Sequence, residues 1–357
     1  MSLEGCKSLR ELPNFTRIPN LEELNLVGCE SLVEVHQSVG SLDKLVTLDL
    51  GGCSNLVKLP TEISLKSLRV LYLSGCTSLK YLPFSIYGLQ NLETLNVSGC
   101  TKLVTLPTKA SISHDHDSGS LVLPKLRVLR INGCNLSTAD FIVSLDCLET
   151  LTELDLSSNN FVSVPALCKF VNLPRIDLYC CKRLLEIPEL PPNILEVNAR
   201  DCKSLEGFFI LPKSLNMLEM LLWNCHRFSY SLCYDMMENI LLNNQNNSPF
   251  KLGLLGCEVP KWFHFSKEVA AYEYGLSSAC AISFEIPSKL NWENIGVAFC
   301  SVGIISTFFM DHRADISIKG FFIDERFYWR CPRSPTPIGH MWLTYIPLAN
   351  LSQTMDI

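Results

Sequence analysis

The sequence lacks a surplus of basic residues. Its 357 residues include 30 Lys and Arg against 36 Asp and Glu, which gives a formal net charge of −6. Proteins that bind nucleic acid neutralise phosphates with a basic patch or stripe, and this composition provides none. The charge balance therefore argues against nucleic acid as a partner.

The sequence also lacks a long apolar run. The longest uncharged apolar stretch is Ile295–Met310, which is shorter than the roughly 20 residues that a membrane-spanning helix needs. Val297, Phe299 and Val302 within it suit buried strands better. Glu4 and Lys7 precede any apolar run, so no secretory signal is recognisable. We expect no membrane span.

Motifs for catalysis and cofactor binding are missing as well. We find no Gly-x-x-x-x-Gly-Lys-Ser/Thr phosphate loop, no nucleophile elbow and no zincin motif. His114, Asp115, His116 and Asp117 could ligate a metal, but adjacent residues on a loop do not fix a coordination geometry, and a solvated loop explains them better. We expect no enzyme activity, no cofactor and no metal.

Cysteine, in contrast, is abundant, and it is periodic. The chain has 17 cysteines. Nine recur at one position of a repeated phrase, where a free thiol can act as a small buried group. Cys180 and Cys181 are adjacent, and we take the first as a strand neighbour of the second. The pattern predicts reduced, structural thiols and a reducing compartment. The nine are Cys6, Cys29, Cys53, Cys76, Cys100, Cys134, Cys181, Cys202 and Cys225.

The repeated phrase is Leu-x-Leu-x-Gly-Cys, as in Leu24–Cys29, Leu48–Cys53 and Leu71–Cys76. Ten copies follow one another at spacings of 21 to 25 residues, apart from one of 34 between Cys100 and Cys134. This is the signature of leucine-rich repeats, in which each copy adds one strand to a parallel stack. Because strand residues alternate, both leucines point into the core and the residue between them points out.

The expected fold class is an α/β leucine-rich-repeat solenoid followed by an all-β sandwich. The repeats occupy residues 1–228, with parallel strands on the concave face and a polar excursion at 109–122. Leu-x-x-Leu-Pro after the bend predicts short, irregular convex segments, because Pro removes a backbone donor. A capping helix and a polar linker are expected at 229–249, and the sandwich at 250–357. Met1–Cys6 already stands inside a repeat, so we expect a fragment of a longer protein.

Two features together resemble one family, the plant intracellular immune receptors of the TIR–nucleotide-binding–LRR class. The first is the combination of Leu-x-Leu-x-Gly-Cys with Leu-x-x-Leu-Pro. The second is Leu254–Phe263, which is similar to the opening of the jelly-roll/Ig-like domain that follows the repeats in that class, with Leu255 in place of the usual Pro. Ile295–Cys300 and His340–Tyr345 resemble two strands of the same domain. The resemblance covers nearly all of the chain.

The resemblance implies a module that recognises a pathogen effector, or a host protein that the effector modifies, in the cytoplasm or nucleus. The TIR and nucleotide-binding domains of the class lie upstream and are not in these residues, and self-association would use them. An adjacent aromatic pair, Trp262 and Phe263, is expected in the core of the second domain and at its junction with the repeats.

The residue between the two leucines is the candidate for protein binding, because the core does not dictate its identity. An ordinary solvated strand face is the alternative for any one residue. For the chain as a whole there are two alternatives, an extracellular receptor ectodomain and a truncated decoy. The extracellular alternative rests on Asn14-Phe15-Thr16 and Asn135-Leu136-Ser137, which fit the glycan acceptor pattern. The candidates are Asn25, Asp49, Tyr72, Asn96, Arg130, Asp155, Asp177, Asn198 and Leu221, flanked by Tyr179 and Trp223.

Overall fold

The computed structural model describes two compact units, one made of Met1–Lys213 with Asn224–Phe228 and one made of Ser214–Trp223 with Ser229–Ile357. Within them, the residues described are 1–106, 122–208, 218–228, 249–255 and the later strands named below. The expected excursion at 109–122 (except Val122), the capping helix and linker at 229–249 (except Pro249), and Trp262 and Phe263 lie outside the described residues.

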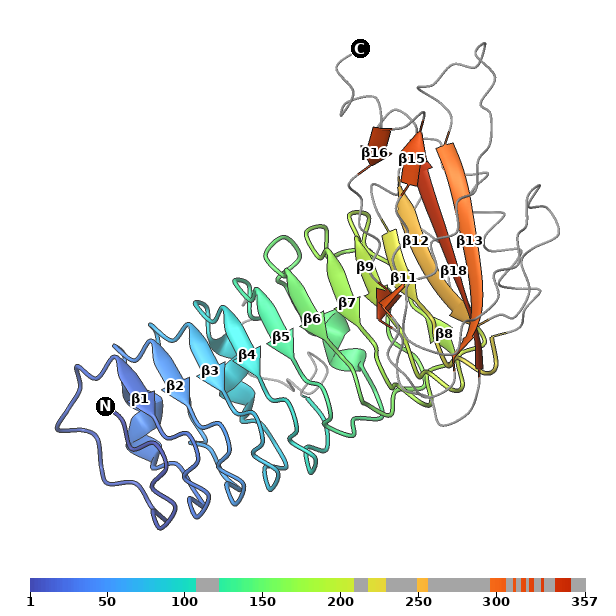
Figure 1. The fold of residues 1–357 in the computed structure, drawn as a ribbon. Helices are drawn as coiled ribbons and strands as arrows, with labels where there is room; N and C mark the ends of the chain where they lie inside the picture. Colours follow the sequence, from blue (N-terminus) through green and yellow to red (C-terminus); the bar gives the residue numbers. More distant parts are fainter. Residues whose placement is uncertain are drawn as a thin grey trace. The chain divides into compact units, whose positions relative to one another are not determined.

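The first unit is a stack of short parallel strands (Figure 1). Each strand has three residues, and its central residue is a Leu, Ile or Val that is at most 2% exposed. The predicted parallel stack is therefore confirmed. In order, the strands are β1 (Glu23–Asn25), β2 (Thr47–Asp49), β3 (Val70–Tyr72), β4 (Thr94–Asn96), β5 (Val128–Arg130), β6 (Glu153–Asp155), β7 (Arg175–Asp177) and β9 (Glu196–Asn198).

The segments that lead back from one strand to the next are short, as expected. The three helical segments described there are five-residue 3-10 turns: η1 (Gln37–Ser41), η2 (Phe84–Gly88) and η4 (Asp140–Ser144). Pro83 immediately precedes η2, where its fixed backbone suits the start of a turn. A two-residue pair, β8 (Glu186–Ile187) with β10 (Gly207–Phe208), also forms. The described residues contain no α-helix, so the α part of the α/β expectation is wrong for them.

The bend after each strand requires a left-handed backbone. Six glycines adopt it, with φ between 67° and 74°, as at Gly75. A Cβ added at Gly75 would lie 3.6 Å from the backbone of Gly52, an ordinary contact, so conformation rather than space favours glycine here. Later rungs place Ser158, Cys180, Asp201 and Asn224 at the same position, with φ between 55° and 62°. Cys180 is thus a turn residue and not the strand neighbour that we expected.

The residue after the left-handed position holds successive rungs together. The buried Cys53 thiol donates a hydrogen bond to the Leu26 carbonyl of the preceding rung, with 3.2 Å between sulfur and oxygen. The thiols of Cys29, Cys76, Cys100, Cys134, Cys181, Cys202 and Cys225 make the same contact at 3.1–3.4 Å. Burial raises the pKa of the Cys53 thiol to about 12 and that of Cys134 to about 11, which keeps the donating proton in place.

Asn159 takes the place of cysteine in one rung. Its side-chain amide donates to the Ile131 carbonyl of the preceding rung at 2.9 Å and to Leu156 of its own rung at 3.0 Å. Its side-chain oxygen accepts from the Leu136 backbone N–H at 3.0 Å. All described cysteines are free thiols, and eight of the nine predicted at the bend are buried. The ninth, Cys6, is exposed, so the expectation of a buried thiol is wrong there.

The second unit contains a mixed sheet with the strand order β11-β12-β18-β13. β11 (Leu218–Leu221) is parallel to β12 (Phe250–Leu255), and β18 (Ile338–Pro347) is antiparallel to both β12 and β13 (Gly296–Ile305). The strands expected near 295–300 and 340–345 are confirmed. Two small hairpin-like pairs complete the described part: β14 (Asp311–His312) with β17 (Trp329–Arg330), and β15 (Ile316–Ile318) with β16 (Phe321–Ile323).

A search of the described residues for helices that are long and apolar enough to span a membrane found none.

The thiol contacts predict the effect of removing one. Cys76→Ala should lower the free energy of unfolding by about 1–3 kcal/mol, because it leaves a small cavity and removes one of the two hydrogen bonds that the Leu50 carbonyl accepts. Chemical denaturation measures this, with exposed Cys6→Ala as the near-neutral control. Dithiothreitol should leave the melting temperature of the wild type unchanged. A large drop would mean that disulfides hold the fold.

The left-handed position predicts two opposite effects. Cys180→Gly should raise stability by about 1 kcal/mol, because a residue with a Cβ is strained at φ 60°. Gly75→Ala should lower it by about the same amount. Thermal melts of the two variants check this, and a loss of stability in Cys180→Gly would show that the Cys180 side chain makes a contact worth more than the strain.

Candidate protein-binding surface

The predicted binding residues of the first unit stand in one row, which we call the strand row. It consists of the last residue of each strand, and each is paired in register with the next. Leu221 belongs to the second unit and is not part of it. The structure brings the row together without testing what it binds. Its members are Asn25, Asp49, Tyr72, Asn96, Arg130, Asp155, Asp177 and Asn198.

Most of the row has a structural task that the sequence did not reveal. In six of the eight residues, a side-chain oxygen accepts the backbone N–H two positions later, which fixes the start of the bend. The distances are 3.0 Å for Asn25, 2.9 Å for Asp49 and Asn96, 3.0 Å for Asp155, 2.8 Å for Asp177 and 3.4 Å for Asn198. Packing of the core does not restrict the residue type at these six positions, but the turn requires a side-chain oxygen there. Tyr72 and Arg130 are the two members of the row that lack this oxygen.

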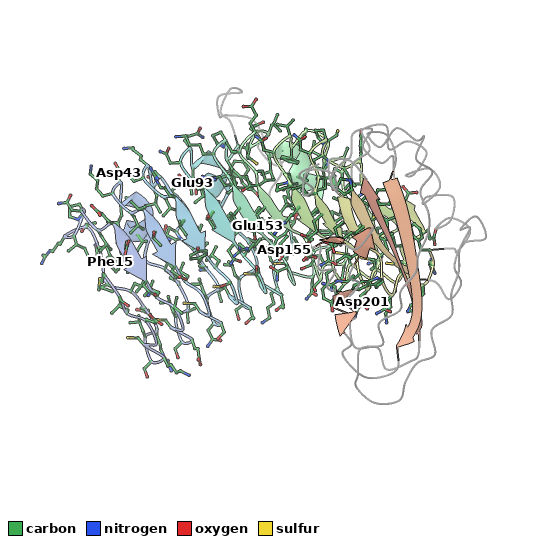
Figure 2. The ribbon with its side chains drawn as sticks, turned by 45° about the horizontal axis from the view of Figure 1, so that its top comes forward. Phe15, Asp43, Glu93, Glu153, Asp155 and Asp201 are labelled. Atoms are coloured by element: carbon green, nitrogen blue, oxygen red, sulfur yellow. The ribbon has the colours of Figure 1, made fainter. Side chains whose placement is uncertain are left out.

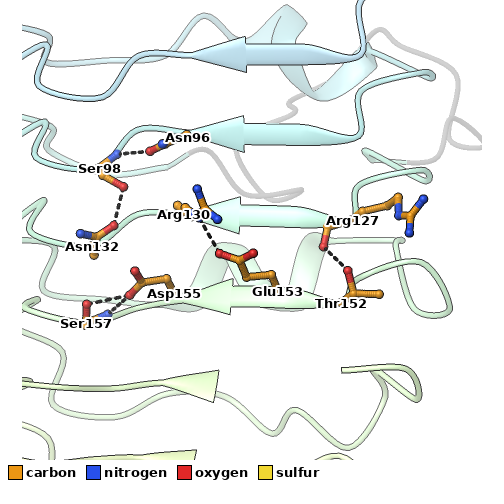
Figure 3. A network of polar contacts seen from close by, with 9 residues as sticks. All are labelled: Asn96, Ser98, Arg127, Arg130, Asn132, Thr152, Glu153, Asp155 and Ser157. Carbon is orange, nitrogen blue, oxygen red and sulfur yellow. Dashed lines mark hydrogen bonds and ion pairs between the residues drawn. The ribbon is translucent and has the colours of Figure 1, made fainter. Parts of the chain in front are cut away.

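Arg130 is held in place by a charged neighbour. Its Nε donates to Glu153 Oε1 on the next strand at 2.5 Å, and both side chains are about 40% exposed (Figure 3). This hydrogen bond is the main reason that the pKa of Arg130 is raised, and the charges of Glu153 and Asp155 add to it. Glu153 and Asp155 are the two outward residues of β6 (Figure 2).

The small side chains beside the row carry a second set of contacts. Ser98 Oγ donates to the side-chain oxygen of Asn132 one rung on, and Ser157 Oγ donates to Asp155 Oδ1 at 2.6 Å (Figure 3). Two positions before the row, four consecutive strands carry Thr47, Val70, Thr94 and Val128, which are uncharged and β-branched. The next three strands carry Glu153, Arg175 and Glu196 there. The face is therefore neutral over β2–β5 in this column and charged over β6, β7 and β9.

The charged part of the face contains an aromatic ring. Tyr179 is 39% exposed, and the Arg200 guanidinium carbon lies 5.6 Å from the centroid of its ring. Arg200 Nε also donates to Asn198 Oδ1 at 2.9 Å. Burial, as the largest cause, raises the pKa of Asp177, and the charge of Asp155 adds to this.

Two of the predicted anchors are less accessible than expected. Trp223 is only 3% exposed, because its indole packs on Gly253 of β12; a Cβ at that glycine would lie 2.3 Å from Trp223 Nε1. Trp223 is thus a packing residue of the second unit and not a surface anchor. Asn198 is 7% exposed, and its amide donates to Asp177.

Other outward residues of this face were not predicted from the sequence as binding candidates. They are the residues that begin each strand, including Glu153 and Arg175, and Arg200 beyond the end of β9. The period-two alternation of strands could have identified them, because residues two before and two after a row position share its face. Among the described residues, no group of three or more His, Cys, Asp or Glu could hold a metal ion.

Comparison with known proteins gives one family match. Residues 64–232 match the family described as "Disease resistance protein RPS4B-like, leucine-rich repeats". Among solved structures, a leucine-rich repeat protein from Bacteroides ovatus aligns over 70% of this chain and 85% of that one, with 15% identity and a TM-score of 0.15. At so low a score, it adds nothing to the geometry described above.

Several curated proteins are similar over part of their length. Disease resistance protein RML1B of Arabidopsis thaliana is 37% identical over 74% of this chain and 23% of its own length. TMV resistance protein N of Nicotiana glutinosa is 28% identical over 50% of this chain and 16% of its own. Disease resistance protein RPS4B of Arabidopsis thaliana is 29% identical over 39% and 13%. The chain thus spans less than a quarter of each of these relatives.

The raised pKa of Asp177 predicts a pH-dependent effect. Its ionised form costs more in the folded state than in the unfolded chain, so Asp177→Asn should raise the melting temperature at neutral pH. Asn keeps an oxygen for the Tyr179 N–H. The advantage should disappear as the pH falls below the ordinary pKa of an aspartate, where the wild type is protonated in both states. A lower melting temperature for the variant at pH 7 would contradict this.

Proposed function

We infer that this chain, whose leucine-rich repeats are of the kind found in plant TIR–nucleotide-binding–LRR disease resistance proteins, recognises a protein in plant defence. The partner that we propose is a pathogen effector or a host protein that an effector modifies. We place this recognition in the cytoplasm or nucleus, where reduced thiols such as those of the ladder persist. Activities of the parts of the relatives that lie outside the matched span are not assigned to this chain.

One observation carries the proposal. The strand row has partly exposed Tyr and Arg side chains, Tyr72 and Arg130, at a position that Asn or Asp occupies in the remaining six strands. Tyr72 and Arg130 lack the turn oxygen that the other row members supply, so the turn gives no reason for these two identities. Tyr and Arg are enriched among residues that dominate binding energy at interfaces. Tyr179 with Arg200 provides a second such pair on the same unit.

We also propose the domain organisation that the sequence suggested: repeats at 1–228, a cap and linker at 229–249, and a jelly-roll/Ig-like domain at 250–357. Strands β12, β13 and β18 support a β domain there, since they form one mixed sheet. Joint recognition by both domains, with Trp262 and Phe263 at their junction, is part of the same proposal.

The extracellular alternative is weakened by one of its two glycan acceptors. The Asn135 side chain donates through Nδ2 to the Thr101 carbonyl of the preceding rung at 3.2 Å, and its backbone is left-handed with φ 59°. A glycan is attached to this same nitrogen, so it would occupy the atom that makes the contact between rungs.

The experiment is a two-hybrid screen of the whole chain against secreted proteins of plant pathogens and a plant cDNA library. Each partner found is then tested against matched tyrosine variants: Tyr72→Ala and Tyr179→Ala on the strand face, and Tyr81→Ala off it. Tyr81 is 62% exposed, so it controls for loss of an aromatic side chain.

We expect partners whose binding falls at least tenfold in one or both strand-face variants and is unchanged in Tyr81→Ala. Melting curves establish that all three variants are folded. If every partner tolerates both strand-face changes, or is lost with Tyr81→Ala, recognition by the strand face is wrong.

A further inference from the structure

Three neighbouring residues of the strand row present hydrogen-bond donors without acceptors in the part of the chain that the structure describes. They are the Tyr72 hydroxyl on β3, the Asn96 amide on β4 and the terminal amino groups of Arg130 on β5. The strands are in register and about 4.8 Å apart, so the three donors span roughly 10 Å.

Asn96 differs from the other two asparagines of the row in this respect. All three give their side-chain oxygen to the turn. The Asn25 amide then donates to Glu4 Oε2 at 3.2 Å, and the Asn198 amide donates to Asp177 at 3.1 Å. The Asn96 oxygen accepts from Ser98 N–H at 2.9 Å, which leaves its amide without an acceptor among the described residues. The turn thus fixes the oxygen of this side chain and leaves its amide available to a ligand.

Arg130 is pre-oriented in the same way. Its Nε is fixed to Glu153, so the terminal amino groups of the planar guanidinium have a restricted direction before any ligand arrives. The strand register places Tyr72 and Arg130 on the two strands that flank Asn96. Such pre-orientation lowers the entropy cost of binding.

The surroundings limit what can approach these donors. The adjoining column on β2–β5 is Thr47, Val70, Thr94 and Val128, which cannot compete for an incoming charge. In the row itself, carboxylates stand on both sides of the three donors: Asp49 on β2 and Asp155 on β6. A ligand with several acidic residues along the row would be repelled by these two carboxylates. A ligand with one acidic side chain placed over Asn96 would avoid this repulsion.

We propose that Tyr72, Asn96 and Arg130 form a seat for one carboxylate side chain, an Asp or Glu flanked by uncharged residues in an extended segment of the partner protein. The proposal deepens the proposed function and rests on it. Hydrogen bonds from Arg130, Asn96 and Tyr72 hold the carboxylate, with Arg130 as the charged donor, and the β-branched column packs against the uncharged flank.

A random twelve-residue peptide library, displayed on phage and selected on the whole chain, provides the probe. We expect the retained peptides to share a single Asp or Glu among uncharged neighbours. A synthetic peptide of this kind is then measured beside its Glu→Gln (or Asp→Asn) version, on the wild type and on Arg130→Gln. Each change alone should weaken binding about tenfold or more, and the two together should cost little more than one.

Matched variants separate the contact from damage to the fold. Tyr72→Phe removes only the hydroxyl, and it should weaken the acidic peptide by a smaller factor while leaving the amide peptide unchanged. Arg183→Gln removes an exposed arginine from outside the strand row and should change neither. Rising salt should weaken the acidic peptide more than the amide one.

Three results would overturn the inference: retained peptides without a shared acid, independent effects of the Arg130 and peptide changes, or no retained peptide at all. Peptides that are lost with Tyr179→Ala but not with Arg130→Gln would also overturn it, while leaving recognition by the strand face intact. The proposed function itself fails only if the partner screen fails.

Discussion

The hydrogen bond from a buried side chain at each bend to a carbonyl of the preceding rung is the contact on which the first unit depends. Each bend must turn the chain by the same amount if the next strand is to stay in register, and this contact sets it. It needs a small donor that can be fully buried, which a protonated thiol supplies and which the amide of Asn159 supplies in one rung. The left-handed residue before it and the turn oxygen of the row position complete the bend. The leucine rows then add the burial of apolar surface that makes the stack stable.

The repeat period allowed much of this unit to be predicted. The parallel strands, the inward leucines, the short return segments and the reduced thiols all follow from spacing, because every copy repeats the same local geometry. Residues without a repeated counterpart were harder. Trp223 was predicted as a surface anchor because of its residue type, yet its indole is buried against Gly253, a contact between residues far apart in the sequence. Cys180 was predicted as a strand residue, but it lies at the left-handed position of the bend. Glycine, Ser158 and Asp201 occupy this position in other rungs, so residue type does not identify it.

The candidate surface illustrates a second limit. Sequence periodicity identifies which residues face outward, but it cannot say which of them the fold already uses. Only the hydrogen bonds of the turn separate Asn25 or Asp49, whose oxygens shape the backbone, from Tyr72 and Arg130, which have no such task. A variable position on a repeat is therefore not equivalent to a free one. The second unit adds the converse case: two of its strands, β13 and β18, were located from resemblance, while the sandwich stays a prediction.

The buried ladder has a chemical consequence for work on this protein. A thiol reacts as its thiolate, and burial raises the pKa of the ladder cysteines so far that almost none ionises near neutral pH. In the described residues, Cys6 and Cys168 are exposed and Cys180 is partly exposed. Among the described cysteines, a maleimide dye should therefore label these three and spare the buried ladder. Of the three, Cys180 follows Tyr179 directly, so a fluorophore attached there would report on the strand face from a native side chain.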